Sequence, residues 1–210
     1  MSALRRRRLV LSIAGASVAM PSLLFHAAQA QGKLRATPGQ TEGPFYPVRL
    51  PDDSDADLLR NGARNYAQGE PAWVEGTLTD LDGKPLVGAM VEIWQADNGG
   101  HYHHPGDGNR ADPAFQGFGR IATDTQGRWR FRTIKPVPYS GRAPHIHVKV
   151  KQGARELLTT QLYVAGAPGN ERDGLWRRLR NDEERDALTR AFTAGSDGVL
   201  KASFPIVVAA

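Results

Sequence analysis

Residues 142–150 read Arg-Ala-Pro-His-Ile-His-Val-Lys-Val, a stretch in which polar and apolar side chains alternate after a proline. Successive side chains of a strand point to opposite faces, so His145 and His147 share one face and Ile146 belongs to the other. Pro144 restricts the residue before it to an extended conformation, so the chain enters this strand rigidly. The stretch therefore predicts a strand with one face in the core and two neighbouring imidazoles on the other.

The chain around this strand has the spacing of a β-sandwich. Short alternating or apolar segments, separated by turns that contain glycine, recur from residue 73 onward. The segments that we expect to be strands are residues 73–79, 88–94, 120–123, 128–134, 145–150, 156–164 and 204–208. Residues 120–134 and 145–164 are predicted to form hairpins, and residues 182–192 a helix. We therefore expect a mainly β fold, an antiparallel or mixed β-sandwich with short helices and long loops.

The first 72 residues differ in composition from the rest. Arg5 to Arg8 precede an apolar run, and Ala28-Gln29-Ala30 supplies a cleavage site, so residues 1–30 have the pattern of an export signal. The arginines fit the twin-arginine route, with an ordinary Sec signal as the alternative. Residues 31–72 are rich in Pro, Gly and Asp, and we expect an extended segment packed on the core, with at most a short helix over residues 55–64. Residues 73–210 then form the sandwich domain of an exported protein, periplasmic or extracellular.

Composition and charge exclude several classes of protein and site. The chain has no Cys, which excludes disulfides and thiolate metal sites. Its net charge of +5 falls to +1 without the four arginines of the leader, so we expect no nucleic-acid partner. The apolar run of the leader is short for a membrane span and no second one follows, so no span is expected. A homo-oligomer is left open.

The histidines and two tyrosines indicate a metal site. Outside the leader, histidine occurs in two places only, at residues 101, 103 and 104 and at residues 145 and 147. Tyr102 lies inside the first group, Tyr139 lies in the loop before the second, and Arg142 is placed to reach the same cavity. Two imidazoles on one strand face can converge on one ion at about 2 Å each. The alternative for the His-x-His pattern alone is a half-exposed strand that carries histidines outward.

Two tyrosines and two histidines together favour ferric iron. A hard trivalent cation prefers anionic oxygen and lowers the pKa of a phenol, so Tyr102 and Tyr139 could bind as tyrosinates. His145 and His147 would complete the site as neutral ligands. No suitable Asp or Glu accompanies them, which argues against a ferrous site of two histidines and one carboxylate.

At this point the sequence resembles the intradiol ring-cleavage dioxygenases, the family of protocatechuate 3,4-dioxygenase and catechol 1,2-dioxygenase. The resemblance runs from residues 41–46, Thr-Glu-Gly-Pro-Phe-Tyr, to the last expected strand. Its strongest stretches are GAMVEIWQAD at residues 88–97, FRTIKP at residues 131–136 and RAPHIH at residues 142–147. It implies an Fe(III) enzyme that uses O2 to break the bond between the two hydroxylated carbons of a catechol, giving a cis,cis-muconate-type product.

The resemblance also implies a role for each matching residue. Tyr102 and His145 correspond to equatorial ligands, and Tyr139 and His147 to axial ones. Arg142 corresponds to the arginine that stabilises charge on the substrate ring, and Gln161 to the glutamine kept beside it. Only Ser140 and Gly141 separate Tyr139 from Arg142, a shorter loop than in familiar members, so a more open pocket is expected.

Two other functions compete with this interpretation. An exported β-sandwich can be a non-catalytic binding module, which would be colourless and free of iron. A zinc hydrolase could use the same histidines. The remaining histidines, His101, His103 and His104, match no ligand role and are expected at the rim of the site.

Overall fold

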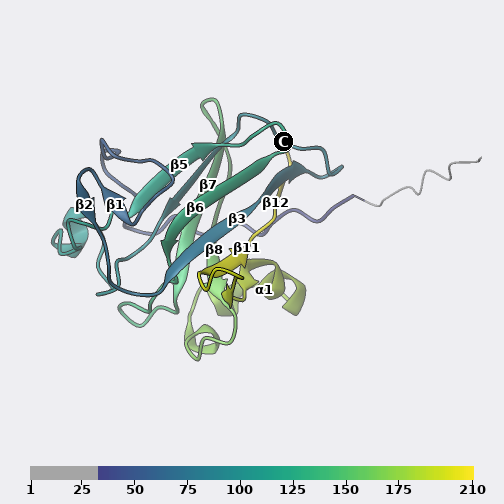
Figure 1. The fold of residues 1–210 in the computed structure, drawn as a ribbon. Helices are drawn as coiled ribbons and strands as arrows, with labels where there is room; N and C mark the ends of the chain where they lie inside the picture. Colours follow the sequence, from purple (N-terminus) through teal and green to yellow (C-terminus); the bar gives the residue numbers. More distant parts are fainter. Residues whose placement is uncertain (1–32) are drawn as a thin grey trace, which may run out of the picture. The chain divides into compact units, whose positions relative to one another are not determined.

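In a computed structural model, which describes residues 33–210, the chain folds into two five-stranded sheets packed face to face (Figure 1). The export signal expected over residues 1–30 lies outside the described residues. The predicted mainly β sandwich is confirmed, and its sheets are mixed because three strand pairs are parallel. Within residues 33–210, no helix has the length and apolar character needed to cross a membrane.

The predicted strand at residue 145 becomes the centre of one sheet, here called the histidine sheet. Its strands, in spatial order, are β5 (Phe118–Ala122), β4 (Met90–Trp94), β7 (His145–Gln152), β8 (Arg155–Val164) and β9 (Thr189–Arg190). β7 pairs antiparallel with β4 and β8, and β8 pairs parallel with β9. The predicted hairpin over residues 145–164 is therefore confirmed.

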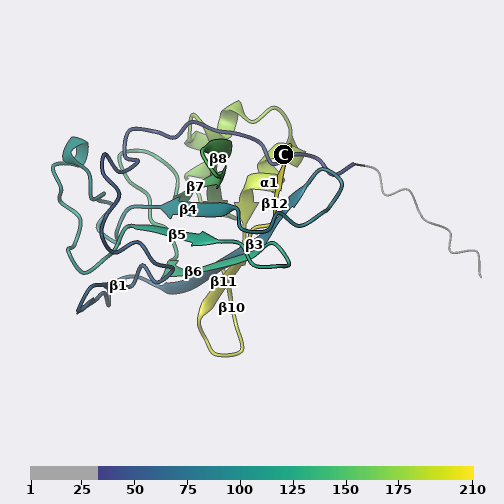
Figure 2. The ribbon, with the colours of Figure 1, turned by 90° about the horizontal axis from the view of Figure 1, so that it is seen from above.

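The second sheet is built on the long strand β3. Its strands are β3 (Pro71–Asp80), β6 (Arg128–Ile134), β10 (Thr193–Ala194), β11 (Leu200–Ser203) and β12 (Ile206–Val208). β6 pairs antiparallel with β3, whereas β11 and β12 pair parallel with successive parts of β3. Figure 2 shows the two layers from above, with β4, β7 and β8 on one side and β3, β6 and β11 on the other.

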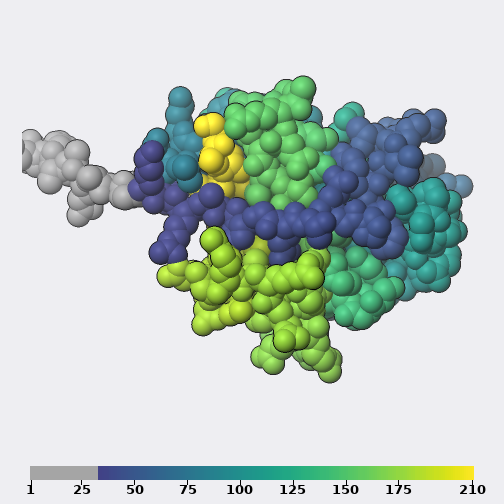
Figure 3. All heavy atoms as spheres, turned by 180° about the vertical axis from the view of Figure 1, so that it is seen from behind, coloured from purple at the N-terminus to yellow at the C-terminus, as the bar shows by residue number. Residues whose placement is uncertain are grey.

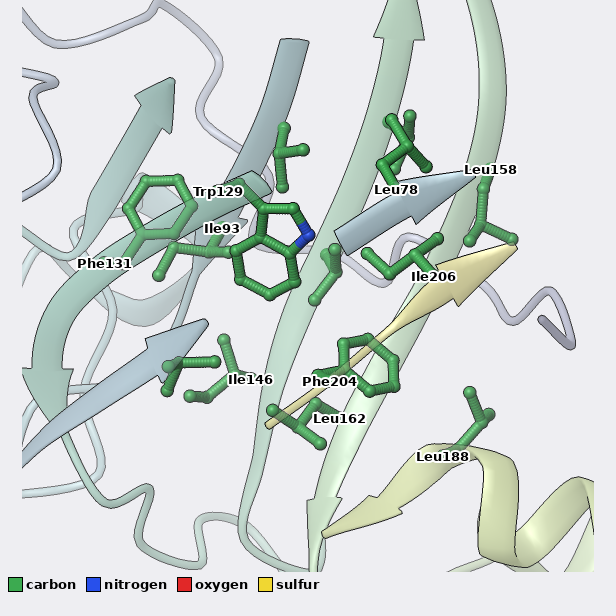
Figure 4. Packing of buried hydrophobic residues seen from close by; sticks show 14 of the residues in the cluster. Leu78, Ile93, Trp129, Phe131, Ile146, Leu158, Leu162, Leu188, Phe204 and Ile206 are labelled. Atoms are coloured by element: carbon green, nitrogen blue, oxygen red, sulfur yellow. The ribbon is translucent and has the colours of Figure 1, made fainter. Parts of the chain in front are cut away.

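Apolar side chains from both sheets meet in the core between them. Ile93, Ile146 and Leu162 of the histidine sheet and Phe131 and Ile206 of the second sheet are all fully buried in one cluster (Figure 4). Burying each such side chain contributes roughly 1.5–3 kcal/mol to folding. Ile146 thus lies on the core face, as the alternation predicted, and turns His145 and His147 to the opposite face.

The predicted hairpin over residues 120–134 is wrong. The turn itself forms, since the amide of Gly127 donates to the carbonyl of Asp124 over 2.9 Å. Beyond the turn the strands separate, because β5 pairs with β4 and β6 pairs with β3. The connection therefore crosses between the sheets, which hydrophobic periodicity cannot distinguish from a hairpin.

The short helix considered for residues 55–64 is also wrong. The chain there makes two tiny antiparallel strands, β1 (Arg60–Asn61) and β2 (Arg64–Asn65). The side chain of Asp55 accepts the amide of Asp57, and the side chain of Asp57 accepts the amide of Leu59. Such local bonds compete with a helix, and Leu58 is fully buried in the core.

The C-terminal elements form near their predicted places but are shorter. Helix α1 spans Asp182–Leu188, with the side chain of Asn181 capping the amide of Glu184. It stops there because Thr189 pairs with Tyr163 as strand β9. The closing strand predicted over residues 204–208 is β12 and begins only at Ile206. Phe204 lies before it and donates its amide to the carbonyl of Glu75. Three 3₁₀ turns complete the fold: η1 (Pro105–Asp107), η2 (Asn170–Arg172) and η3 (Trp176–Arg178).

The N-terminal segment lies along the outer face of the histidine sheet (Figures 2 and 3). The amide of Gln40 donates to the carbonyl of Thr159 over 2.8 Å, and the amide of Thr37 donates to the carbonyl of Val207 over 2.9 Å. These bonds fasten an irregular segment to both sheets. The outer face of β7, where the two histidines lie, is consequently covered.

Gly76 on β3 provides a test of the packing between the strands. A Cβ at this position would overlap the backbone carbonyl of Phe204 and come within 3.0 Å of the Trp129 ring. We expect Gly76→Ala to lower the free energy of unfolding by about 3 kcal/mol, because backbone has to shift. The control is Gly174→Ala, because a Cβ added at Gly174 would have no atom within 4 Å. This variant is expected to change the free energy of unfolding by less than about 0.5 kcal/mol. Equal urea midpoints for the two variants would contradict this account.

Candidate active site

The two histidines of β7 converge on the outer face of the sheet. Their Nε2 atoms lie 3.1 Å apart, and both side chains are buried. Burial and the charge of Arg142 lower the pKa of His145 to about 4, and burial followed by His145 lowers the pKa of His147 well below its usual value. Both imidazoles are therefore neutral, and each has an uncharged nitrogen to offer at the same point.

Tyr102 and Tyr139 stand beside these histidines. The two tyrosine rings meet edge to face with their centroids 5.1 Å apart. The ring centroid of Tyr139 lies 5.4 Å from that of His145, and the ring centroid of Tyr102 lies 6.1 Å from that of His147. Burial raises the pKa of both phenols, that of Tyr102 most strongly. The Tyr102 hydroxyl is buried without a hydrogen bond of ordinary geometry to any described residue, although Tyr139 is near enough to affect its pKa. The structure thus brings together the four residues that the sequence predicted as ligands.

Tight turns place both tyrosines. The carboxylate of Asp97 accepts the amides of Gly99 and His101, and the amide of Tyr102 donates to Asp107. At Tyr139 the chain reverses through Ser140 and Gly141, with φ values of 43° and 75°. The amide of Arg142 then donates to the carbonyl of Tyr139 over 2.7 Å. The two-residue gap in the sequence is therefore a turn that folds Arg142 back beside Tyr139.

Arg142 is held by three side chains. Its Nε donates to Asp173 over 2.7 Å, and its Nη2 donates to Gln161 over 2.6 Å and to the Tyr163 hydroxyl over 3.4 Å. The neighbouring strand β8 supplies Gln161, directly opposite His147 in register. Burial alone would lower the pKa of Arg142, but the bond to Asp173 raises it above the usual value. The guanidinium is thus a fixed cation next to Tyr139.

Asp173 is the part of the site that the sequence did not reveal. It is fully buried and accepts hydrogen bonds from Arg142, from the amide of Ala143, and from the amides of Leu175 and Trp176. One carboxylate therefore ties the Tyr139–Arg142 turn to the segment before η3. A single Asp in a charged, irregular stretch has no pattern that marks it in the sequence.

The first histidine group serves its own loop. His103 Nε2 lies 2.6 Å from the carbonyl of Phe115, and His104 Nδ1 accepts the amide of Gly106 at the start of η1. His101 Nδ1 lies 3.5 Å from Asp107. These contacts stabilise the loop that carries Tyr102. The sequence had predicted only that the three histidines lie at the rim of the site, and it did not predict this structural role.

The donor set fits ferric iron. Ligand nitrogens lie about 2 Å from a metal, so two neutral nitrogens 3.1 Å apart can share one ion. Within residues 33–210 no three His, Cys, Asp or Glu side chains cluster as a metal site. The oxygen donors beside the two histidines are those of Tyr102 and Tyr139. The nearby carboxylate, Asp173, is committed to Arg142. A cation that stabilises phenolate would satisfy the buried Tyr102 oxygen.

A cavity of about 670 Å³ opens beside this group of residues. Tyr139 and Arg142 line it, together with three prolines and Arg172 of η2. Its walls are mainly apolar, which suits an aromatic ring, and its two arginines suit negative charge.

Comparisons with known proteins match this chain to dioxygenases. A dioxygenase family model matches residues 41–193. The chain is 41% identical over 138 residues to the protocatechuate 3,4-dioxygenase beta chain of Burkholderia cepacia, covering 60% of this chain and 58% of that one. It is 35% identical over 157 residues to catechol 1,2-dioxygenase of Acinetobacter baylyi, covering 66% and 50%. It thus spans about half the length of such relatives. The dioxygenase domain of a Streptomyces sp. SirexAA-E dioxygenase carbohydrate-binding protein fusion superposes with a TM-score of 0.65 at 32% identity, covering 82% of this chain and 97% of that domain.

The ion pair of Asp173 and Arg142 predicts a dependence of stability on pH. Burial alone would raise the pKa of Asp173, but bonds from Arg142 and from the amides of Ala143 and Trp176 lower it below the usual value. Its stabilisation is therefore complete above an unfolded pKa of about 4 and is lost as the pH falls through the lower folded pKa. We expect Asp173→Asn to cost about 3 kcal/mol at pH 7, and the difference from the natural protein to shrink towards pH 3. Urea unfolding of both proteins at pH 7 and pH 3 measures this difference in stability. A difference that is the same at both pH values would contradict the role of the Asp173 carboxylate.

Proposed function

The chain belongs to the intradiol ring-cleavage dioxygenases, and from that premise we propose that it is an Fe(III)-dependent enzyme acting on a catechol. It would use O2 to break the bond between the two hydroxylated carbons of the ring and release a cis,cis-muconate-type product. The observation that best supports this proposal is the convergence of two neutral histidines, a buried tyrosine and a half-buried tyrosine beside a cavity that a fixed arginine also lines.

Tyr102, Tyr139, His145 and His147 would hold the iron. When bound, ferric iron would stabilise the tyrosinates and draw electron density from a coordinated catecholate. The neutral state that burial gives to His145 and His147 suits them as ligands, because protonated imidazoles could not bind.

Proton transfer and charge stabilisation would be carried out by protein side chains. Tyr139 is half-buried and lines the cavity, so its oxygen, as the phenolate that bound iron would stabilise, would take the proton of a substrate hydroxyl. Arg142 would stabilise negative charge that develops on the ring. Gln161 and Asp173 hold that guanidinium from two sides, so it needs no rearrangement when the charge appears. Its neighbours thus preorganise Arg142 before the substrate arrives.

We also propose that the enzyme is exported and works in the periplasm or outside the cell. The support is the leader pattern of residues 1–30, with its four consecutive arginines. If the twin-arginine route is used, changing Arg6 and Arg7 to lysine is expected to abolish export of the folded protein. Export that is undiminished in this variant would point to the Sec route.

Absorption spectroscopy tests the proposed function directly. Iron-replete protein is expected to show a visible tyrosinate-to-Fe(III) band that shifts when catechol is added without oxygen, and admission of O2 should yield the ring-opened acid. Tyr102→Phe is expected to change or abolish the band. Tyr66 is a buried tyrosine whose hydroxyl accepts the amide of Asn98, so Tyr66→Phe is the matched control and should preserve the band.

Three outcomes of that experiment would contradict the proposal. A colourless protein that binds no iron would indicate a binding module. Zinc at stoichiometric occupancy, with no response to catechol, would indicate a hydrolase. A band that survives in Tyr102→Phe unchanged would show that the ligand assignment is wrong.

A further inference from the structure

The two histidines of β7 are oriented in different ways. His145 has its Nδ1 atom 2.7 Å from the carbonyl of Ala143, the bond that normally fixes the ring of a metal-binding histidine. The Nδ1 atom of His147 is buried and makes no hydrogen bond to any of residues 33–210. Because the remaining nitrogen, Nε2, faces His145 over 3.1 Å, no hydrogen bond to the surrounding backbone sets the plane of the His147 ring.

Packing on two sides supplies this constraint. The indole of Trp94 stacks on the His147 ring, with centroids 4.7 Å apart and planes within 9°. At the edge of the ring lies Gly43, where an added Cβ would come within 3.3 Å of His147 Cε1. Gly43 has a φ of +74°, so both its conformation and its lack of a side chain suit this close approach.

Gly43 belongs to residues 38–46, here called the N-terminal strap, which crosses the outer face of the histidine sheet (Figure 3). Four hydrogen bonds join the strap to β8. Thr160 Oγ1 donates to the carbonyl of Pro38, and the amide of Gln40 donates to the carbonyl of Thr159. The Tyr163 hydroxyl donates to the side chain of Gln40, and Gln161 Nε2 donates to the carbonyl of Thr41. The last bond joins the strap to the glutamine that holds Arg142.

Lys149 holds the strap next to His147 through ion pairs. It follows His147 by two residues on the same face of β7, and its side chain is only 6% exposed. Its ammonium pairs with Glu42, the residue before Gly43, and with Glu156 of β8 at 3.1 Å. It also lies 4.1 Å from the centre of the Tyr46 ring.

Tyr46 connects Lys149 to Trp94, the residue that stacks on the His147 ring. Its ring meets the indole of Trp94 edge to face at 5.0 Å, and its hydroxyl donates to Glu92 over 2.8 Å. Lys151 pairs with Glu92 and donates to the Tyr46 hydroxyl. The contacts at the edge and on the face of the His147 ring, Gly43 and Trp94, are thus linked through the strap to the charged side chains of β4 and β7.

We propose that Glu42 and Lys149 are positioning residues for His147: their ion pair seats the N-terminal strap so that Gly43 and Trp94 fix the plane of the imidazole. That the ring is fixed for iron rests on the proposed function, whereas its orientation by the strap does not. The pair suits this task because the Lys149 side chain is only 6% exposed, so moving Glu42 away with the strap removes one of the two carboxylates that balance a desolvated charge.

Matched truncations of the two partners of Lys149 test the proposal. Glu42→Ala removes the partner in the strap, and Glu156→Ala removes the partner in β8. In iron-free protein, Glu42→Ala is expected to shift and broaden the NMR signal of His147 Cε1–H while the signal of His145 stays in place. In iron-loaded protein it is expected to weaken retention of Fe(III) about 10-fold or more. Glu156→Ala is expected to leave both readouts close to those of the natural protein.

A second variant protects the test against a general loss of folding. Gly43→Ala leaves every charge intact and places a methyl group against His147 Cε1, so it should move the same NMR signal. The proposal is overturned if the His147 signal is unchanged in Glu42→Ala and Gly43→Ala, or if Glu156→Ala has the same effect as Glu42→Ala. If the signal responds but the natural protein binds no iron, the proposed function fails and the positioning by the strap stands.

Discussion

The structure depends on strand β7 being buried on both faces. Ile146 and its apolar neighbours face the core, which fixes the strand between β4 and β8. The alternation then places two histidines and Lys149 on the outer face, where all three are also buried. Polar groups can lie in such a place only if they are neutral or paired. The histidines are neutral, and the lysine is paired with two carboxylates.

The outer face of β7 needs cover, and irregular chain provides it. The N-terminal strap crosses β7 and β8 from one side, while the Tyr139–Arg142 turn and the segment around Asp173 close the other. Each covering segment is fixed by an ion pair with one buried member, Lys149 in its pair with Glu42 and Asp173 in its pair with Arg142. A preorganised site requires its covering loops to be fixed by such contacts.

Much of this arrangement could be predicted from particular residues. The alternation at residues 145–150 predicted the face that each side chain occupies, and the ligand types of Tyr102, Tyr139, His145 and His147 predicted that they meet. The errors arose where local patterns have two outcomes. The turn at residues 124–127 forms as expected, yet its strands enter different sheets. The stretch at residues 55–64 allowed a short helix, but its aspartates bond to nearby amides.

By itself, the sequence determined the strand periodicity, the set of possible metal ligands and the resemblance to one family, because these depend on residue type and spacing along the chain. Only the tertiary structure decided which buried carboxylate holds Arg142, and which segment covers His147. Asp173 lies 31 residues from Arg142 in the chain, and Glu42 lies 107 residues from Lys149. Ion pairs between such distant residues leave no local pattern, since any of many charged residues could have been the partner. The packing of the sheets and the path of the N-terminal segment make the choice.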